Sequence, residues 1–278
     1  MNGKKHLLDF GERGYFDKRN KLNDLTGKEW LQRLKSVWIS QRCIEDKPAF
    51  QHPAPFLIED IRKLITLFTK KNQIVLDCFM GSGSTLVACT KDNRIGIGIE
   101  LNKKYIKLAK SRLKNYNIKK FKIIHGDALK KIPKLKTKID YFITSPPYHD
   151  ILKNNGQGIR HDGSQKRQGV EYYSEDLRDV GNQKTYDDYL ELMKKIMKEV
   201  YKKLRKGKYA TVIVSDFTVK KKETNAHGDI IKLMQEIGFE FVGNIILVQD
   251  SKPLYPFGYP YAYKINHVHQ YLLNFRKN

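Results

Sequence analysis

The stretch Val75-Leu76-Asp77-Cys78-Phe79-Met80-Gly81-Ser82-Gly83-Ser84-Thr85 places a glycine turn after an apolar run and before a helical pattern. Glycine lets the backbone pass close to a ligand, where a β-carbon would collide. A strand, a glycine turn and a helix in this order are typical of Rossmann-type α/β proteins. The stretch therefore predicts a parallel sheet with a ligand at the carboxyl ends of its strands.

Short apolar runs alternate with helical patterns on both sides of this stretch, which favours a doubly wound α/β sheet. The other expected strands are Arg94–Glu100, Lys122–His125, Ile139–Thr144 and Tyr209–Ser215, and the expected helices include Ile58–Thr69 and Tyr186–Leu204. The last two runs, Phe239–Gln249 and Val268–Phe275, have no helix between them. They predict an antiparallel hairpin at the end of the sheet.

About fifty residues precede this pattern. Thr26-Gly27-Lys28-Glu29 fits a capping box at the start of a helix. The apolar residues that would share one face of this helix are Trp30, Leu34, Val37 and Trp38. We predict a helical extension (residues 1–50) packed on a catalytic domain (residues 51–278), with a loop insertion at residues 149–185.

Composition points to a polyanionic partner. The chain has 53 Lys and Arg against 30 Asp and Glu, a formal net charge of +23, and basic residues bind phosphates. A lysine-rich composition spread over every surface is the alternative. The three cysteines have no metal-ligand spacing and none follows a proline, so neither a metal site nor a Pro-Cys nucleophile is expected. Without a signal peptide or membrane span, we expect a soluble, cytoplasmic protein.

Two acids follow the next strands of the sheet. Glu100 ends one strand at the place where Rossmann-type sites bind ribose hydroxyls. Asp127 follows another, where a carboxylate could accept from an adenine amino group. A dinucleotide enzyme is the competing interpretation, but Leu86 occupies the place of the third glycine of its motif. These acids and the glycine turn together predict an adenosine-containing ligand.

The fourth strand runs directly into Ser145-Pro146-Pro147-Tyr148. In open α/β sheets reactions occur at this edge, and prolines hold the backbone rigid. If the polyanionic partner is a nucleic acid, the reacting group would be an amino group on a base ring, which is a poor nucleophile because its lone pair is delocalised into the ring. For that case we assign the Ser145 side chain and the Pro146 carbonyl to accept its two N–H bonds. Tyr148 would stack on an extruded base. Alone the tetrad would be only a turn; after a cofactor set it predicts a catalytic site formed by Ser145, Pro146, Pro147 and Tyr148.

Two segments resemble those of the amino-methylating (N4-cytosine or N6-adenine) DNA methyltransferase family. Asp77–Gly83 is similar to the family's Asp-Pro-Phe-x-Gly-Ser-Gly cofactor motif, and His52–Phe56 to its His-Pro-Ala-Pro-Phe segment. Cys78 and Leu57 replace two usual prolines. The resemblance implies a Rossmann-like fold with a seven-stranded, mostly parallel sheet and S-adenosylmethionine as cofactor. The implied cofactor-binding residues are His52, Phe56, Asp77, Phe79, Gly81, Gly83, Ser84, Thr85, Glu100 and Asp127.

Within this family the Ser form of the tetrad resembles that of the cytosine-N4 enzymes. The expected function is therefore site-specific methylation of cytosine N4 in double-stranded DNA, with a cognate restriction endonuclease as a further expected partner. The motifs run cofactor first and tetrad second, the reverse of the order common among those enzymes, and we see no separate target-recognition domain. RNA cytidine-N4 or DNA adenine-N6 methylation stays open, as does, remotely, a catalytically silent module that binds cofactor and nucleic acid.

Two segments could contact the target. The polar insertion after the tetrad reads as a lid or nucleic-acid clamp, with Arg160, Lys166 and Arg167 as candidate contacts. The segment before the last strand interleaves aromatics with prolines, including Tyr255, Tyr259 and Tyr261. These residues suit base stacking and equally suit a rigid cover over the cofactor pocket.

Overall fold

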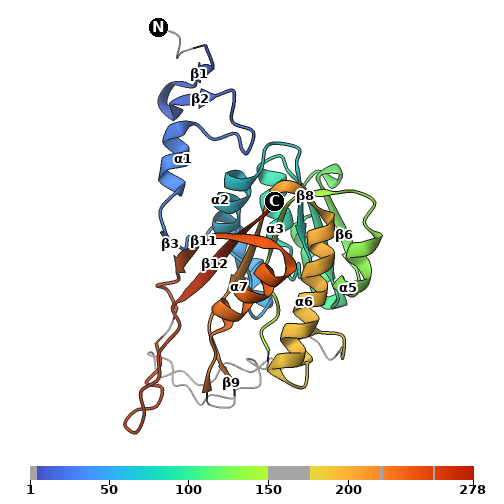
Figure 1. Cartoon of the computed structure of the whole chain (residues 1–278), viewed down its shortest axis with the longest axis vertical. Coiled ribbons are helices and arrows are strands. Elements are labelled where there is room, and N and C mark those ends of the chain that lie inside the picture. Colours follow the sequence, from blue (N-terminus) through green and yellow to red (C-terminus); the bar gives the residue numbers. More distant parts are fainter. Residues whose placement is uncertain (1–4, 150–175, 220–221, 253) are drawn as a thin grey trace.

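The structure, a computed structural model, describes residues 5–149, 176–219, 222–252 and 254–278. A twisted sheet forms its centre, with helices on both faces (Figure 1). The strand order is β3-β11-β12-β8-β7-β4-β5-β6. The strands are β3 Val37–Ile39, β4 Ile74–Asp77, β5 Ile95–Glu100, β6 Phe121–His125, β7 Ile139–Thr144, β8 Leu204–Val214, β11 Phe239–Val248 and β12 His269–Lys277. The predicted α/β class is confirmed, but this sheet has eight strands rather than seven.

Strands β4 to β8 of this sheet are parallel, and β12 is antiparallel to both of its neighbours, β8 and β11. The predicted terminal hairpin is therefore present. The strand order reverses direction at β4, which pairs in parallel with β5 on one side and with β7 on the other. Such a switch point opens a crevice at the carboxyl ends of the strands, where ligands bind in open α/β sheets.

Two apolar layers cover the sheet. The helices are α2 (Ile58–Phe68), α3 (Ser84–Lys91) and α4 (Lys103–Arg112) on one face, and α5 (Ala128–Lys131), α6 (Tyr186–Lys203) and α7 (Ala226–Ile237) on the other. Strand β7 is buried throughout: Phe142 packs with the second group, Tyr141 and Ile143 with the first. This is the alternation of a strand covered on both faces. None of the helices described is long and apolar enough to cross a membrane.

The N-terminal part corrects one prediction. A small hairpin of β1 (Leu7–Asp9) and β2 (Tyr15–Asp17) leads into α1 (Gly27–Arg33), and the expected capping box of Thr26 and Glu29 is present. The helix ends at Arg33, however, so it does not carry Val37 and Trp38, which belong to β3. Trp38 is buried while its two neighbours are exposed, the period-2 pattern of a strand. This strand pairs in parallel with β11 and becomes the edge of the sheet.

Short elements complete the description. The 3-10 helices are η1 Gly11–Arg13, η2 Ile44–Gln51, η3 Ile118–Lys120, η4 Ile132–Lys134 and η6 Val180–Asn182. A two-residue pair, β9 (Thr218–Val219) and β10 (Lys222–Glu223), lies between β8 and α7. The element η6 matters most here, because it lies near the end of the predicted insertion (residues 149–185) and returns the chain to the crevice.

Candidate active site

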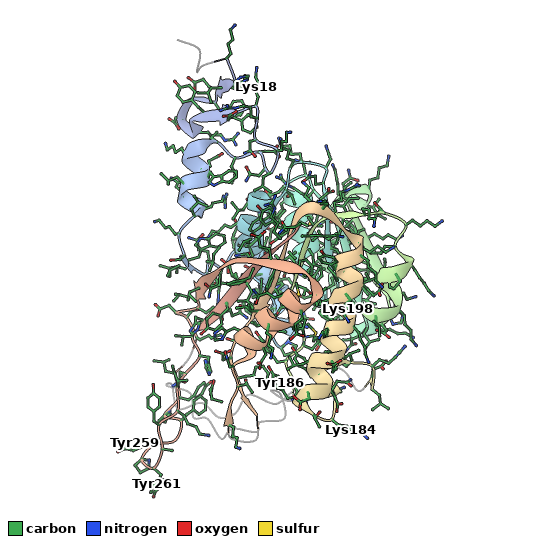
Figure 2. The ribbon with its side chains drawn as sticks, viewed as in Figure 1. Lys18, Lys184, Tyr186, Lys198, Tyr259 and Tyr261 are labelled. Atoms are coloured by element: carbon green, nitrogen blue, oxygen red, sulfur yellow. The ribbon has the colours of Figure 1, made fainter. Side chains whose placement is uncertain are left out.

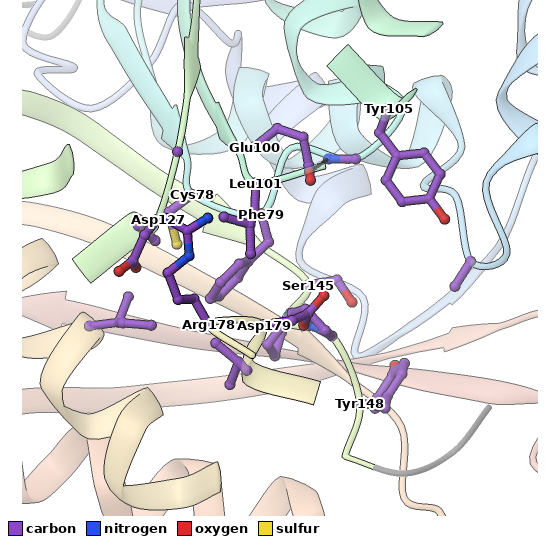
Figure 3. A pocket seen from close by; sticks show the side chains of 18 of the residues that line it. Cys78, Phe79, Glu100, Leu101, Tyr105, Asp127, Ser145, Tyr148, Arg178 and Asp179 are labelled. Atoms are coloured by element: carbon purple, nitrogen blue, oxygen red, sulfur yellow. Dashed lines mark hydrogen bonds between the residues drawn. The ribbon is translucent and has the colours of Figure 1, made fainter. Parts of the chain in front are cut away.

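A pocket lies at the switch point, where the carboxyl ends of β4, β5, β6 and β7 meet (Figure 3). Its empty volume is about 680 Å³ with the part open to solvent included. Its wall contains the following predicted residues: His52, Phe79, Gly81, Glu100, Asp127, Ser145, Pro146, Pro147 and Tyr148. The structure therefore brings the tetrad and half of the predicted cofactor set to one cavity.

The glycine turn is held by the acid of the next strand. Gly81 has φ +52°, and its N–H donates to Oε2 of Glu100 at 2.8 Å. The other oxygen of Glu100 accepts from the Asn102 N–H at 2.7 Å. Burial raises the pKa of Glu100 to about 7. Each carboxylate oxygen keeps a second lone pair, so this side chain can still accept from a ligand.

Asp77 has a different position from the one expected. It is buried outside the pocket wall, where Oδ2 accepts from Thr85 Oγ1 at 2.6 Å and Oδ1 accepts from Thr144 Oγ1 at 2.7 Å. Oδ1 also accepts from the Phe79 N–H at 3.1 Å. Burial raises the pKa of this carboxyl. Asp77 thus ties the glycine turn to the end of β7, one residue before the tetrad.

Four other predicted cofactor residues support the pocket without lining it. Gly83, with φ +81°, starts α3 at a close approach to α4: a β-carbon there would lie 2.8 Å from Cβ of Ala109. Ser84 donates to the Phe56 carbonyl at 2.8 Å, and Thr85 is engaged by Asp77. Phe56 packs with the apolar layer that contains α2. These four residues therefore stabilise the glycine turn and the start of α3 from outside the pocket wall.

His52 and Tyr105 form one side of the pocket. The rings meet edge to face with centroids 4.3 Å apart. Burial lowers the pKa of His52 to about 4, and its Nδ1 accepts from the Ala54 N–H at 3.2 Å. On the opposite side, Asp127 caps α5 by accepting from the Leu129 N–H at 2.9 Å. The pocket therefore has a neutral imidazole on one side and an acidic group on the other.

The tetrad follows β7 and lines the same pocket. Tyr148 is buried, and its ring lies edge to face against Phe217 with centroids 5.5 Å apart. Its hydroxyl accepts from Nε2 of Gln270 at 3.4 Å. Burial raises the pKa of Tyr148, and hydrogen bonding with Gln270 and Ser145 opposes that rise. The Tyr148 ring is therefore positioned by β12 and by the residues after β8.

Several wall residues were missed by the sequence analysis. They are Ala54, Cys78, Leu101, Tyr105, Gly126, Ala128, Arg178, Asp179, Val180 and Ile196. Half of them are close neighbours of predicted residues in the sequence, so a wider window around each motif could have found those. Arg178 to Val180 come from the far end of the insertion, and no local pattern signals that the chain returns to the pocket there.

The two candidate target-binding segments have different outcomes. Arg160, Lys166 and Arg167 lie outside the described residues. Tyr255, Tyr259 and Tyr261 belong to the β11–β12 loop (residues 249–268), and none of its described residues lines the pocket. Tyr259 and Tyr261 are 82% and 95% exposed and lie at its tip, away from the sheet (Figure 2). The cover over the cofactor pocket, one of our two interpretations, is therefore wrong for these residues.

The fold and the site define a class, the Rossmann-like S-adenosylmethionine-dependent methyltransferases. A structural relative is TrmN from Thermus thermophilus, with a TM-score of 0.50 and 13% identity, covering 84% of this chain and 52% of TrmN. A sequence model described as DNA methylase matches residues 11–111 and 139–278. A second, described as conserved hypothetical protein 95, matches residues 64–199. The chain belongs to the N6/N4 DNA methylase family.

Two curated relatives share part of this sequence. The orphan methyltransferase M.BamHII of Bacillus amyloliquefaciens is 37% identical over 122 residues, 42% of this chain and 45% of the relative. The Type II methyltransferase M.BglI of Bacillus subtilis is 39% identical over 106 residues, 37% of this chain and 28% of the relative. The matches thus span less than half the length of either relative.

The cofactor of this chain is S-adenosylmethionine, which confirms the prediction. The pocket fits it in two respects. Its wall places carboxylates beside an apolar floor, as a cationic adenosine derivative requires. At Gly81, a β-carbon would lie 3.0 Å from Nε2 of His52, so the turn leaves space that a side chain would fill. Both Glu100 and Asp127 line this pocket, and their contacts with the ribose and the adenine amino group stay predictions.

Proposed function

We propose that this chain is a site-specific DNA methyltransferase that transfers a methyl group from S-adenosylmethionine to the N4 amino group of cytosine. The observation that carries the proposal is the common pocket of Ser145, Tyr148 and Glu100. Strands β4 and β7 are hydrogen-bonded neighbours, so a base amino group held by the tetrad would face the cofactor directly. Alignment of this kind can lower a barrier by roughly 7–11 kcal/mol.

In the proposed mechanism the chain's own residues position the amino nitrogen. The Ser145 hydroxyl and the Pro146 carbonyl accept its two N–H bonds, which draws its lone pair out of conjugation with the ring. The Tyr148 ring stacks on the base, which must leave the duplex to reach a buried pocket. When bound, S-adenosylmethionine would supply the methyl group from its sulfonium: the N–C bond would form as the S–CH3 bond breaks, and S-adenosylhomocysteine would leave. The methylated nitrogen would then give its proton to water, so the protein needs no strong base. The choice of cytosine rests on Ser at the first position of the tetrad.

Duplex DNA is the proposed substrate because of charge and family. The net charge of +23 suits a polyphosphate, and the matching family is described as DNA methylase. We assign target contact to the exposed tyrosines of the β11–β12 loop and to Arg160, Lys166 and Arg167. We further propose a partner restriction endonuclease that acts on the same DNA site, which the Type II name of M.BglI supports. A cytoplasmic location belongs to the same proposal.

The test identifies the methylated nucleoside. The protein is incubated with isotopically labelled cofactor and either duplex DNA or total RNA, and the digested nucleosides are analysed by mass spectrometry. Ser145→Ala, which should transfer methyl groups much more slowly, is the matched control. We expect labelled N4-methylcytosine in DNA. Label in N6-methyladenine, or in RNA alone, would contradict the proposed base or polymer. Cofactor binding without transfer to any substrate would indicate a catalytically silent module.

A further inference from the structure

The insertion after the tetrad ends in a segment that is docked against the tetrad itself. A β-carbon on Gly181 would lie 3.1 Å from the Tyr148 carbonyl oxygen and 3.3 Å from Cβ of Pro147, so the backbone of η6 packs directly on these residues. Nε2 of His149 lies 2.9 Å from the Gln183 carbonyl oxygen, a second connection between the two segments. The residues of η6 are therefore held at a defined place beside the pocket.

This docking brings Asp179 into the pocket wall (Figure 3). Asp179 is 7% exposed, and its Oδ1 accepts from the Gly181 N–H at 3.0 Å as the N-cap of η6. Burial is the main cause of the raised pKa values of Glu100 and Tyr105, and the negative charge of Asp179 adds to both. The charge of Asp179 therefore interacts electrostatically with Glu100 and Tyr105, which form the other side of the cavity.

The charges of the pocket leave one role unfilled. Among the described wall residues the carboxylates are Glu100, Asp127 and Asp179, and the one arginine, Arg178, already pairs with Asp176 at 2.8 Å. Glu100 and Asp127 are placed for ribose and adenine, Asp77 is buried behind the wall, and the tetrad begins with an uncharged serine. S-Adenosylmethionine has a cationic ammonium group on its methionine part, and a cation taken from water needs an anionic partner.

We propose that Asp179 binds the methionine ammonium group of S-adenosylmethionine. The assignment rests on the proposed use of this cofactor as methyl donor but not on which base or polymer is methylated. The carboxylate accepts N–H bonds of the ammonium group while its cap to Gly181 stays in place. Since η6 also packs on Pro147 and Tyr148, the same element fixes the cofactor and the tetrad relative to each other.

The test removes the charge and keeps the cap. Asp179→Asn retains an oxygen that can accept from the Gly181 N–H, and Asp187→Asn is the matched control because Asp187 is exposed on α6 outside the pocket. Calorimetry then gives the affinities for S-adenosylmethionine, S-adenosylhomocysteine and 5′-methylthioadenosine. The first two have the ammonium group, and the third lacks the amino acid. Thermal unfolding checks that each variant folds. If Asp179→Asn does not fold, Asp179→Ser takes its place, because serine is also a good N-cap residue.

We expect Asp179→Asn to lower the affinity for both ammonium-containing ligands by roughly ten- to hundredfold, as loss of a charged hydrogen bond does. The affinity for 5′-methylthioadenosine should change by no more than about twofold. Loss of affinity for all three would indicate a structural role for Asp179 and overturn the assignment. Loss for S-adenosylmethionine alone would assign the carboxylate to the sulfonium, and no loss would exclude contact. A wild-type protein that binds none of the three would instead overturn the proposed function.

Discussion

The backbone N–H of Gly81 donates to Oε2 of Glu100 at 2.8 Å, which joins the turn after β4 to the end of β5. This one hydrogen bond connects the two motifs that were predicted separately from the sequence. It orients the carboxylate, and it restricts the turn to the left-handed conformation observed at Gly81. We therefore expect cofactor affinity to depend on both residues together, because a change in either would move the other.

Gly81→Ala should weaken cofactor binding by about tenfold or more. The φ of +52° disfavours any residue with a β-carbon by about 1–2 kcal/mol, and the new methyl group would lie 3.0 Å from Nε2 of His52. Calorimetric titration with S-adenosylmethionine measures the effect. Gly27→Ala is the control, because Gly27 lies in α1 with no atom within 4 Å of a β-carbon. Equal affinities for the wild type and Gly81→Ala would show that the turn can shift without cost.

Glu100→Gln should change how stability depends on pH. The pKa of Glu100 is raised from its ordinary value of 4.5 to about 7, so the folded chain keeps this proton where the unfolded chain has lost it. The contribution of Glu100 to the free energy of unfolding therefore falls as pH rises from 4.5 to 7, by on the order of 3 kcal/mol, and is constant above 7.

Urea unfolding of the cofactor-free protein across pH 4.5 to 8 measures this contribution. The wild type should lose stability relative to Glu100→Gln through that interval. For the control Glu191→Gln, which changes an exposed carboxylate of α6, the curve of unfolding free energy against pH should run parallel to that of the wild type. Parallel curves for the wild type and Glu100→Gln would mean that folding does not shift the pKa of Glu100.

Ser145→Ala should reduce turnover, on the order of 10²-fold, as loss of one positioned hydrogen-bonding group does. The cofactor affinity should stay nearly unchanged, because the hydroxyl is assigned to the base amino group. Single-turnover methylation rates and calorimetry separate the two quantities, and Ser111→Ala, on the exposed side of α4, is the control. A large loss of cofactor affinity would place Ser145 in the cofactor site instead.

The double variant Tyr259→Ala and Tyr261→Ala should weaken binding to duplex DNA. Stacking of an aromatic side chain on a base is worth about 1–3 kcal/mol per base, and both rings are almost fully exposed. Fluorescence anisotropy with labelled duplexes measures the loss, and cofactor affinity should be unaffected because none of the described loop residues lines the pocket. Tyr15→Ala, on the exposed hairpin strand β2, serves as control. Unchanged DNA affinity would remove the loop from the interface.

Features coded by neighbouring residues were predictable from the sequence. Strand β7 has the predicted bounds, Ile139–Thr144, and the glycine turn and Thr26 cap are where they were expected. Each depends on a local pattern of apolar spacing, glycine or capping side chains. The motif order needs no special explanation, since β4 and β7 pair directly and form the same site whichever comes first in the chain.

Features that depend on distant contacts were not predictable in the same way. The residues Val37 to Ile39 are a strand only because they pair with Ile246–Val248, about two hundred residues further on. A run with two tryptophans, at Trp30 and Trp38, fits a helical stripe when viewed alone. Likewise, Asp179 reaches the pocket through the contact of Gly181 with the tetrad, which no spacing in the chain signals.

The edge position of β3 has a practical consequence for anyone who shortens the protein. Removing the residues up to Ile39 would leave the hydrogen-bonding groups of Ile246–Val248 on β11 without their partner. An uncovered edge of this kind is a template for association with other strands. Truncated versions prepared for crystallisation should therefore begin before Val37, or they will tend to aggregate through β11.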